Sequence, residues 1–385
     1  MSILHNIYLA LFIAFSMFWG VLWPLILGFA LSGIVQAVIS HKTLAKTLGC
    51  DDTKCLTFAT LFGIASSSCS YAAVALARAI FQKGASFTSA IVFELASTNL
   101  VIELGIILFV LMGWQFAAAE WVGGIIMVVI IALIFRFTLT KKLIRAARNK
   151  AAKGALGKME GHAAMDMSVL KKGSFAQRLF SSDGFTAVSN YFVMDWASIW
   201  VDLFLGFLIA GALAAWVPHS VLQAFFFKNN PTLAFIEGPL VGPLVAIISF
   251  VCSVGNVPLA AVLWQGGISF GGVVSFIFAD LIVLPILDIY RKYYGWKVML
   301  YILGTFYITM ALAGYIIELL FSALHIIPTN RSIAVVMQGI QWNYTSWLNI
   351  IFLVIAVILV IRFIKTGGIP MLGMMEKTEH EMTHH

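Results

Sequence analysis

The chain has 385 residues, of which 61% are apolar and 11% are charged. Soluble domains have about 45–50% apolar and about 25% charged residues, so this composition excludes an ordinary soluble enzyme, a disordered chain and a disulfide scaffold. The formal net charge is +7, but a large share of it lies in one stretch. That clustering indicates membrane topology rather than nucleic-acid binding.

The apolar stretches are too long for barrel strands of about 10 residues and long enough for bilayer-crossing helices of about 20. The predicted fold is an all-α polytopic membrane protein with about 8–10 transmembrane helices, and the N-terminus is expected to be the first retained span. The candidate spans are residues 8–40, 56–82, 86–112, 117–139, 186–217, 239–265, 268–290, 296–326 and 346–365. The first, fifth and eighth are longer than one crossing needs, so each is a tilted helix, a helix with an interfacial lead-in, or a pair.

A basic stretch follows the fourth candidate span and predicts a cytoplasmic loop, because loops rich in Lys and Arg stay on the inner side. If every later segment crosses once, the basic pairs 291–292 and 362–365 fall on the outer side. A segment that enters and leaves on one side would remove this conflict, and residues 239–265 are the most interrupted candidate. The loop holds Lys141, Lys142, Arg145, Arg148, Lys150, Lys153, Lys158, Lys171, Lys172 and Arg178.

Self-comparison of the sequence indicates an internal duplication. The offset that places Cys69-Ser70 on Cys252-Ser253 also places Gly84 on Gly267 without a gap, and a slightly smaller offset places Gly33 on Gly211. Repeats with interrupted helices around a midplane site are typical of secondary transporters. The predicted organisation is a first repeat (1–140), a basic loop (141–184), a second repeat (185–365) and a polar tail (366–385).

Small polar residues interrupt one span in each half, at 66–72 and at 252–258. Such residues either let helices pack closely and bond back to the backbone, or line a cavity. The Gly255-Asn256-x-Pro258 sequence favours a helix break beside a cavity, because broken helices leave backbone groups that need a partner.

These residues belong to a recognisable pattern. The segments 252–258 (Cys-Ser-x-Gly-Asn-x-Pro), 266–273, 278–282 and 290–295 (Tyr-Arg-Lys-Tyr-Tyr-Gly) resemble the predicted-permease family that contains the ArsP organoarsenical efflux permeases. The first-half motif, from Cys69-Ser70 to Ala96-Ser97-x-Asn99, is similar to that family's other signature. The resemblance covers about residues 18–365 and implies efflux of a small toxic solute, with trivalent organoarsenicals as candidates. Tyr71 stands where many members have a second cysteine, so one thiol is absent.

Thiols are the natural ligands for soft trivalent ions. Cys69 and Cys252 are therefore either convergent ligands at one site or simply small buried apolar residues. No cofactor and no metal site are expected. The predicted substrate-binding residues are Ser68, Cys69, Ser70, Asn99, Cys252, Ser253, Gly255, Asn256 and Pro258.

Acidic residues within the spans are the other signal, because a carboxylate in a bilayer is costly and faces a cavity, a partner or an ion path. We expect Glu94, Glu103, Asp202 and Asp280 to couple transport to an ion, the alternative being interhelical structural pairs. Further acidic candidates are Asp195, Glu237 and Asp288.

Enzyme motifs such as a Walker loop or a nucleophile elbow are absent. The literal H-E-x-x-H at 380–384 lies in the polar tail and is read as a chance match. The sequence predicts a permease of the cell inner membrane, in contact with the lipid bilayer and a small-molecule substrate, with no nucleic-acid partner. The alternative is an intramembrane enzyme or a membrane subunit of a larger complex, and the oligomeric state is not predicted.

Overall fold

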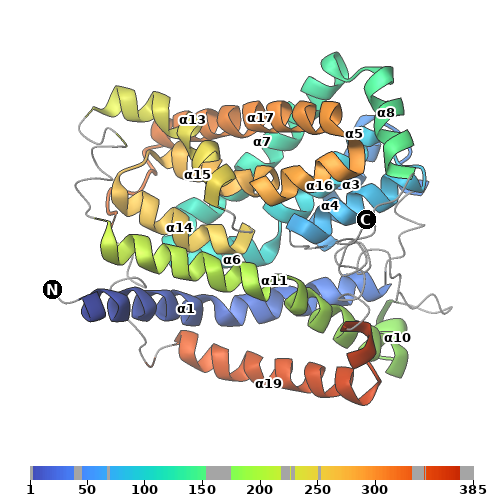
Figure 1. The fold of residues 1–385 in the computed structure, drawn as a ribbon, viewed down its shortest axis with the longest axis horizontal. Helices are drawn as coiled ribbons and strands as arrows, with labels where there is room; N and C mark the ends of the chain where they lie inside the picture. The colour runs from blue at the N-terminus through green and yellow to red at the C-terminus, as the bar shows by residue number, and fades with distance from the viewer. Residues whose placement is uncertain are drawn as a thin grey trace.

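The computed structural model describes residues 3–38, 46–66, 70–152, 175–217, 226, 230–249, 253–331, 342 and 344–372, and every regular element among them is helical (Figure 1). This confirms the predicted all-α class. The elements are α1 (Ile3–Val38), α3 (Thr53–Ser66), α4 (Ser70–Gln82), α5 (Phe87–Asn99), α6 (Ile102–Met112), α7 (Trp114–Thr138), α8 (Lys141–Ala152), α10 (Phe175–Leu179), α11 (Ser182–Trp216), α13 (Pro231–Ser249), α14 (Ser253–Gly266), α15 (Phe270–Phe278), the short 3₁₀ helix η1 (Ala279–Ile282), α16 (Leu284–Tyr294), α17 (Trp296–Ala323) and α19 (Tyr344–Lys365).

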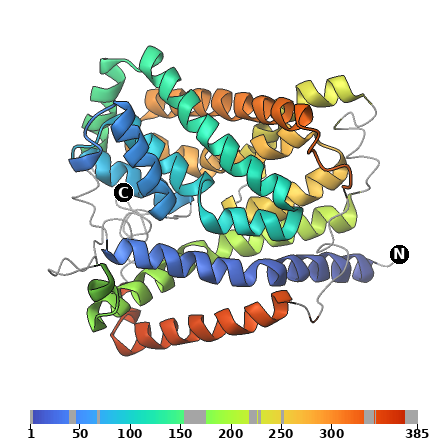
Figure 2. The same cartoon turned by 180° about the vertical axis from the view of Figure 1, so that it is seen from behind.

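Length and apolar composition make six segments of the described chain able to cross a bilayer, and the bent pair α15–η1 and α16 makes a seventh. The six are in α1, α5 with α6, α7, α13, α17 and α19. The three long predicted spans, 8–40, 186–217 and 296–326, each correspond to one continuous helix. Helix α19 lies at the edge against α1 and α11 (Figures 1 and 2). Only 17% of its apolar window is buried, which is typical of a lipid-facing helix.

The segment 56–82, predicted as one crossing, is instead two short helices that run in opposite directions. Ser89 at the start of α5 bonds the carbonyl of Cys50 just before α3, and Gly63 later in α3 lies against Phe93 of α5. Helices α3 and α5 are therefore parallel, while a tight turn makes α4 antiparallel to α5. The pair α3–α4 thus begins and ends at the same end of the molecule.

The second half repeats this arrangement. Gly238 of α13 lies against Ser269 at the start of α15, and Gly242 lies one turn further along against Ser275. Helix α13 is thus parallel to α15, and α14 returns to the end from which α13 starts. This geometry fits the alternative, left open by the sequence, in which 239–265 enters and leaves on one side. The predicted helix break at Gly255-Asn256-x-Pro258 is wrong, because α14 continues through Gly255 and Pro258. A proline removes one helical hydrogen bond and crowds the preceding turn, and the burial of α14 holds the rest of that helix.

The two ends of the molecule differ in charge. We call them the α8 end, which holds α8 and the α4–α5 turn, and the Trp264 end, which holds the α14–α15 turn. Arg148 of α8 donates to the carbonyl of Ala85, and Arg362 bonds Ser182, so the C-terminal end of α19 is also at the α8 end. Arg331, bonded to the carbonyl of Trp264, is the only described Lys or Arg side chain at the other end.

Turn geometry recurs at the positions that self-comparison pairs. Gly84 and Gly267 both adopt positive φ, +118° and +109°, which glycine tolerates and which ends α4 and α14. Ser86 and Ser269 then cap α5 and α15, each accepting a hydrogen bond from the backbone N–H three residues on. Local sequence therefore builds the same helix–turn–helix unit twice.

Helices α1 and α11 lie side by side and antiparallel (Figures 1 and 2). Gly33 near the end of α1 faces the carbonyl of Val188 near the start of α11, and Gly211 near the end of α11 faces the carbonyl of Ala10. The offset that pairs Gly33 with Gly211 also pairs Ala10 with Val188, so each contact is the counterpart of the other. The two helices that self-comparison of the sequence pairs thus run in opposite directions.

Candidate functional site

Three helix ends meet in the middle of the molecule, and we call this meeting point the junction. Ser70 is the first residue of α4, Ser253 is the first residue of α14, and Asp280 lies in η1. The Oγ atoms of Ser70 and Ser253 each lie 2.7 Å from Oδ2 of Asp280. They lie 2.9 Å from each other. Two residues that self-comparison of the sequence pairs therefore share one carboxylate.

The sequence explains why a carboxylate is tolerated at this place. Two helix N-termini point toward it, and the N-terminus of a helix carries partial positive charge from its unpaired N–H groups. The two serine hydroxyls add direct donors to Asp280. All three side chains are buried, with Ser70 and Asp280 fully so. The site is closed to solvent in this conformation.

Asn99 and Asn256 lie beside the junction. Asn99, the last residue of α5, is fully buried and close enough to Asp280 to act on its carboxylate. Its amide nitrogen donates to Thr98 at 3.0 Å, while its Oδ1 has no partner within the described chain. Asn256 accepts from Ser249 of α13 at 3.4 Å, and its Nδ2 likewise has no described partner. Buried amide atoms without partners are uncommon in folded proteins, which makes Asn99 and Asn256 candidates for contact with water or a solute.

Glu94 is connected to the second half through a tyrosine. It is fully buried in α5, and its Oε1 accepts a hydrogen bond from the hydroxyl of Tyr290 in α16. Its Oε2 has no partner in the described residues. Glu94 is also close enough to Asp280 for the two carboxylates to interact.

Glu120 of α7 was missed by sequence reasoning. It is 1% exposed, and neither of its carboxylate oxygens has a partner among the described residues. Asp280 acts on it electrostatically. A signal was available, because Glu120 is an acidic residue within the apolar segment 117–139. Tyr290 lies in a recognised motif, but nothing in the sequence assigned it a role.

Other predicted residues lie elsewhere. Glu103 is buried in the first turn of α6, where Gly28 of α1 packs against it. Asp195 accepts hydrogen bonds from Ser32 and Gln36 of α1, both at 3.4 Å. Asp202 lies in α11, but its side chain is not described. Ser68, Cys69 and Cys252 lie outside the described residues, so the thiol hypothesis stays a prediction.

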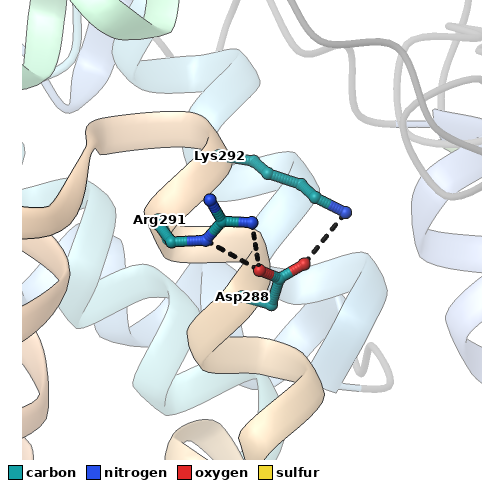
Figure 3. Close-up of polar contacts among 3 residues, drawn as sticks. All are labelled: Asp288, Arg291 and Lys292. Carbon is teal, nitrogen blue, oxygen red and sulfur yellow. Dashed lines mark hydrogen bonds and ion pairs between the residues drawn. The ribbon is translucent and has the colours of Figure 1, made fainter. Parts of the chain in front are cut away.

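Asp288 is not a buried coupling residue. It forms ion pairs with Arg291 at 2.6 Å and with Lys292 at 2.9 Å, one helical turn further along α16 (Figure 3). Its side chain is 43% exposed. The sequence left open that acidic residues near segment ends lie at the membrane interface, and Asp288 is such a residue. This makes Asp288 a useful control.

The clearest cavities lie away from the junction. A groove of about 1040 Å³ runs between α3 and α7, with Cys50, Thr57 and Arg136 among its lining residues. Cys50 and Cys55 beside this groove form a disulfide that the sequence did not predict. A smaller cavity of about 460 Å³ lies between α1 and α11, and its lining includes Phe15 and Trp196. Neither is lined by Asp280.

Comparison with known proteins identifies the class of the chain. The ArsP_1 family, described as a predicted permease, matches residues 6–319. The Mycobacterium tuberculosis protein named "Putative permease Rv2963" is 60% identical over 338 residues, which cover 88% of this chain and 83% of that protein. The Escherichia coli protein named "UPF0718 protein YraQ" is 28% identical over 120 residues, which cover 31% of this chain and 33% of that protein. No solved structure matches the chain.

Proposed function

Because this chain belongs to the ArsP_1 family of predicted permeases, we propose that it is a secondary transporter that moves its solute through the junction. It is a multi-pass membrane permease. The observation that carries the proposal is the meeting of Ser70, Ser253 and Asp280, in which both halves of the chain contribute to one buried polar site. A site between two halves is the usual place for a transported solute.

The directions of the helices support a mechanism of alternating access. Helices α1 and α11 are antiparallel, and the contact of Gly33 is the counterpart of the contact of Gly211. Two halves of this kind form an inverted repeat whose axis lies in the membrane plane. Rocking one inverted half against the other opens the shared site to each side in turn.

The charge difference between the ends supports an orientation. Basic side chains of α8, α16 and α19 gather at the α8 end, and Arg331 is at the opposite end. Each of the helix pairs 53–82 and 231–266 starts and ends on one side of the membrane. Arg291 and Arg362 therefore lie on the same side as the basic loop. The positive-inside rule then places the α8 end in the cytoplasm, with the protein in the inner membrane.

The proposed substrate class rests on the sequence next to the two serines. Cys69 and Cys252 directly precede Ser70 and Ser253 in the chain, and we propose that each half contributes one thiol to the solute. Soft trivalent ions prefer sulfur ligands. We therefore propose efflux of a thiophilic solute, with trivalent organoarsenicals as the first compounds to test.

The test is uptake into inside-out vesicles that contain the protein. Trivalent methylarsenical, inorganic arsenite and a sulfur-containing metabolite are compared with and without a pH gradient. We expect accumulation of the methylarsenical, its loss in Ser70→Ala/Ser253→Ala, and its retention in the control Asp288→Asn. Accumulation that is unchanged in the double variant would show that the solute does not pass the junction.

A further inference from the structure

The junction holds more short oxygen contacts than it has hydrogens. Three oxygens, from Ser70, Ser253 and Asp280, form a triangle with sides of 2.7, 2.7 and 2.9 Å. A hydroxyl has one hydrogen and an ionised carboxylate has none, so three contacts share two hydrogens when Asp280 is ionised. A proton on Asp280 completes the ring, with Asp280 donating to Ser70, Ser70 to Ser253 and Ser253 to Asp280.

Two further carboxylates lie on either side of Asp280 along the molecule. At 1.5 Å per helical residue, Glu94 lies about 12 Å from Ser86 at the α8 end, and Asn99, beside Asp280, lies about 20 Å from it. Glu120 lies about 27 Å from the α8 end of its own helix at Thr138. Asp280 acts electrostatically on both Glu94 and Glu120. The order from the α8 end is therefore Glu94, Asp280, Glu120.

These three side chains need a positive partner that the described protein does not give them. No Lys, Arg or His in the described chain forms an ion pair with Glu94, Asp280 or Glu120. Each has at least one oxygen with no described partner. An uncompensated carboxylate in a membrane interior is costly. Glu94 and Glu120 therefore require a cation, whereas the charge of Asp280 is stabilised only by two hydroxyls and two helix N-termini.

A proton fits the arrangement better than a metal ion. A metal ion needs several ligand atoms at one point. The only cluster of three His, Cys, Asp or Glu ligands in the described residues is Cys50, Asp52 and Cys55, near the α8 end, and its two cysteines are joined in a disulfide. The carboxylates of Glu94, Asp280 and Glu120 are instead spread along the molecule. A proton needs one oxygen at a time and can pass between groups.

Aromatic and basic side chains lie between Glu94 and the α8 end. The hydroxyl of Tyr290 binds Glu94, and the ring of Tyr294 stacks on that of Tyr290 with centroids 6.4 Å apart. Arg78 lies 4.3 Å from the ring centre of Tyr293 and donates to the carbonyl of Ala151 in α8 at 3.0 Å. The elements packed against α5, α7 and η1 carry other charged side chains, and none of these side chains acts on Asp280. They are Lys54, Lys83, Glu103, Arg136, Glu237, Asp288, Arg291, Lys292, Lys297 and Glu318.

We propose that Glu120, Asp280 and Glu94 form a proton path and that this permease couples solute movement to a proton gradient through it. The proposal rests on the proposed function. In each step one carboxylic O–H bond breaks, the donor becomes a carboxylate, and one O–H bond forms on the next oxygen. Water or the solute bridges the gaps between carboxylates. At Glu94, the hydroxyl of Tyr290 donates a hydrogen bond to the carboxylate and keeps its own hydrogen, and water takes the proton from Glu94 on toward the α8 end.

The first experiment detects the protons without any substrate. Infrared difference spectra of the reconstituted protein are recorded between acidic and alkaline media, and they report the C=O band of protonated carboxyl groups. We expect bands that disappear as the pH rises, with one component lost in each of E94Q, E120Q and D280N. E120Q should also move the pH range over which the Asp280 component disappears, whereas the control D288N should not. Bands that never titrate, or that disappear when sodium chloride is added at constant pH, would overturn the proton path.

The second experiment measures coupling in proteoliposomes that contain a pH-sensitive dye, with trivalent methylarsenical as the probe. Coupling between two sites typically changes affinity by roughly 5–150-fold, and we expect E120Q to lose gradient-driven uptake by a factor in that range. Exchange of the probe without a gradient should persist. Full gradient-driven uptake by E120Q would overturn the proposal. If the wild type moves no arsenical, the proposed substrate is wrong, and the infrared result alone decides the proton path.

Discussion

The hydroxyl oxygens of Ser70 and Ser253 lie 2.9 Å apart although the two residues are far apart in the chain. They occupy equivalent positions at the starts of α4 and α14. A residue that touches its own counterpart lies close to the axis that relates the two halves. Asp280 contacts both serines, and self-comparison of the sequence pairs it with Ser97. The first half therefore has no carboxylate at the position that corresponds to Asp280.

We predict that Ser70→Ala and Ser253→Ala have similar effects. Each removes one of two hydroxyl donors to Asp280, and hydrogen bonds to charged groups contribute about 1.5–3 kcal/mol. The two losses should not be additive in the double variant, because all three oxygens form one network. Thermal unfolding in detergent and vesicle transport measure this. Additive losses would indicate that each serine acts alone.

We predict that Ser86→Ala and Ser269→Ala each lower stability by about 1 kcal/mol, the usual effect of losing an N-cap hydroxyl. Both serines cap a helix in the same way, at 2.9 and 3.0 Å. Unfolding midpoints of the two variants, compared with Ser322→Ala as the control near the end of α17, measure the effect. Unequal losses would show that the two turns do not have the same role.

The sequence predicted the helical class, and it left open whether a segment returns to its own side, with 239–265 as the candidate because Pro239, Pro243 and Pro258 mark it as interrupted. It did not predict the same path for 56–82, which contains no proline. There the turn depends on the close approach of Gly63 in α3 to Phe93 in α5, a contact between two different helices that no local pattern reveals.

The candidate site was predicted in part. Ser70, Ser253 and Asp280 were each identified, but only the fold brings them to one point. Glu120 was missed although it carries the signal that marked Glu94 and Asp280, an acidic residue within an apolar segment. Its relation to Asp280 depends on the packing of α7, which no local pattern encodes.

We predict that a fluorescent protein fused after residue 385 is fluorescent, whereas a periplasmic alkaline phosphatase fused there is inactive. Arg362 at the end of α19 bonds Ser182 at the start of α11, next to the basic loop, and basic ends remain in the cytoplasm. Biotin labelling of a Leu324→Cys variant at the Trp264 end, with a reagent that does not cross membranes, should occur in intact cells. The opposite pattern would reverse the orientation and make the α8 end external.

Cys69 and Cys252, which directly precede Ser70 and Ser253 in the chain, are proposed ligands of the solute. Cys69→Ser or Cys252→Ser keeps the size of the side chain but replaces a soft sulfur ligand with a hard oxygen. If the thiols bind the solute, cells with either variant should lose resistance to methylated trivalent arsenicals while protein levels stay normal. If they are buried apolar residues, serine lowers stability modestly and leaves the choice of substrate unchanged.

The outcome can be separated from misfolding by a matched control. Cys50→Ser and Cys55→Ser change the disulfide beside α3 and leave the junction intact, so they should keep resistance. Because Tyr71 stands where many relatives have a cysteine, we also expect weaker arsenical resistance than such relatives confer. Full resistance in the Cys69→Ser/Cys252→Ser double variant would exclude thiol coordination, and the polar junction around Asp280 would then have to select the solute without sulfur.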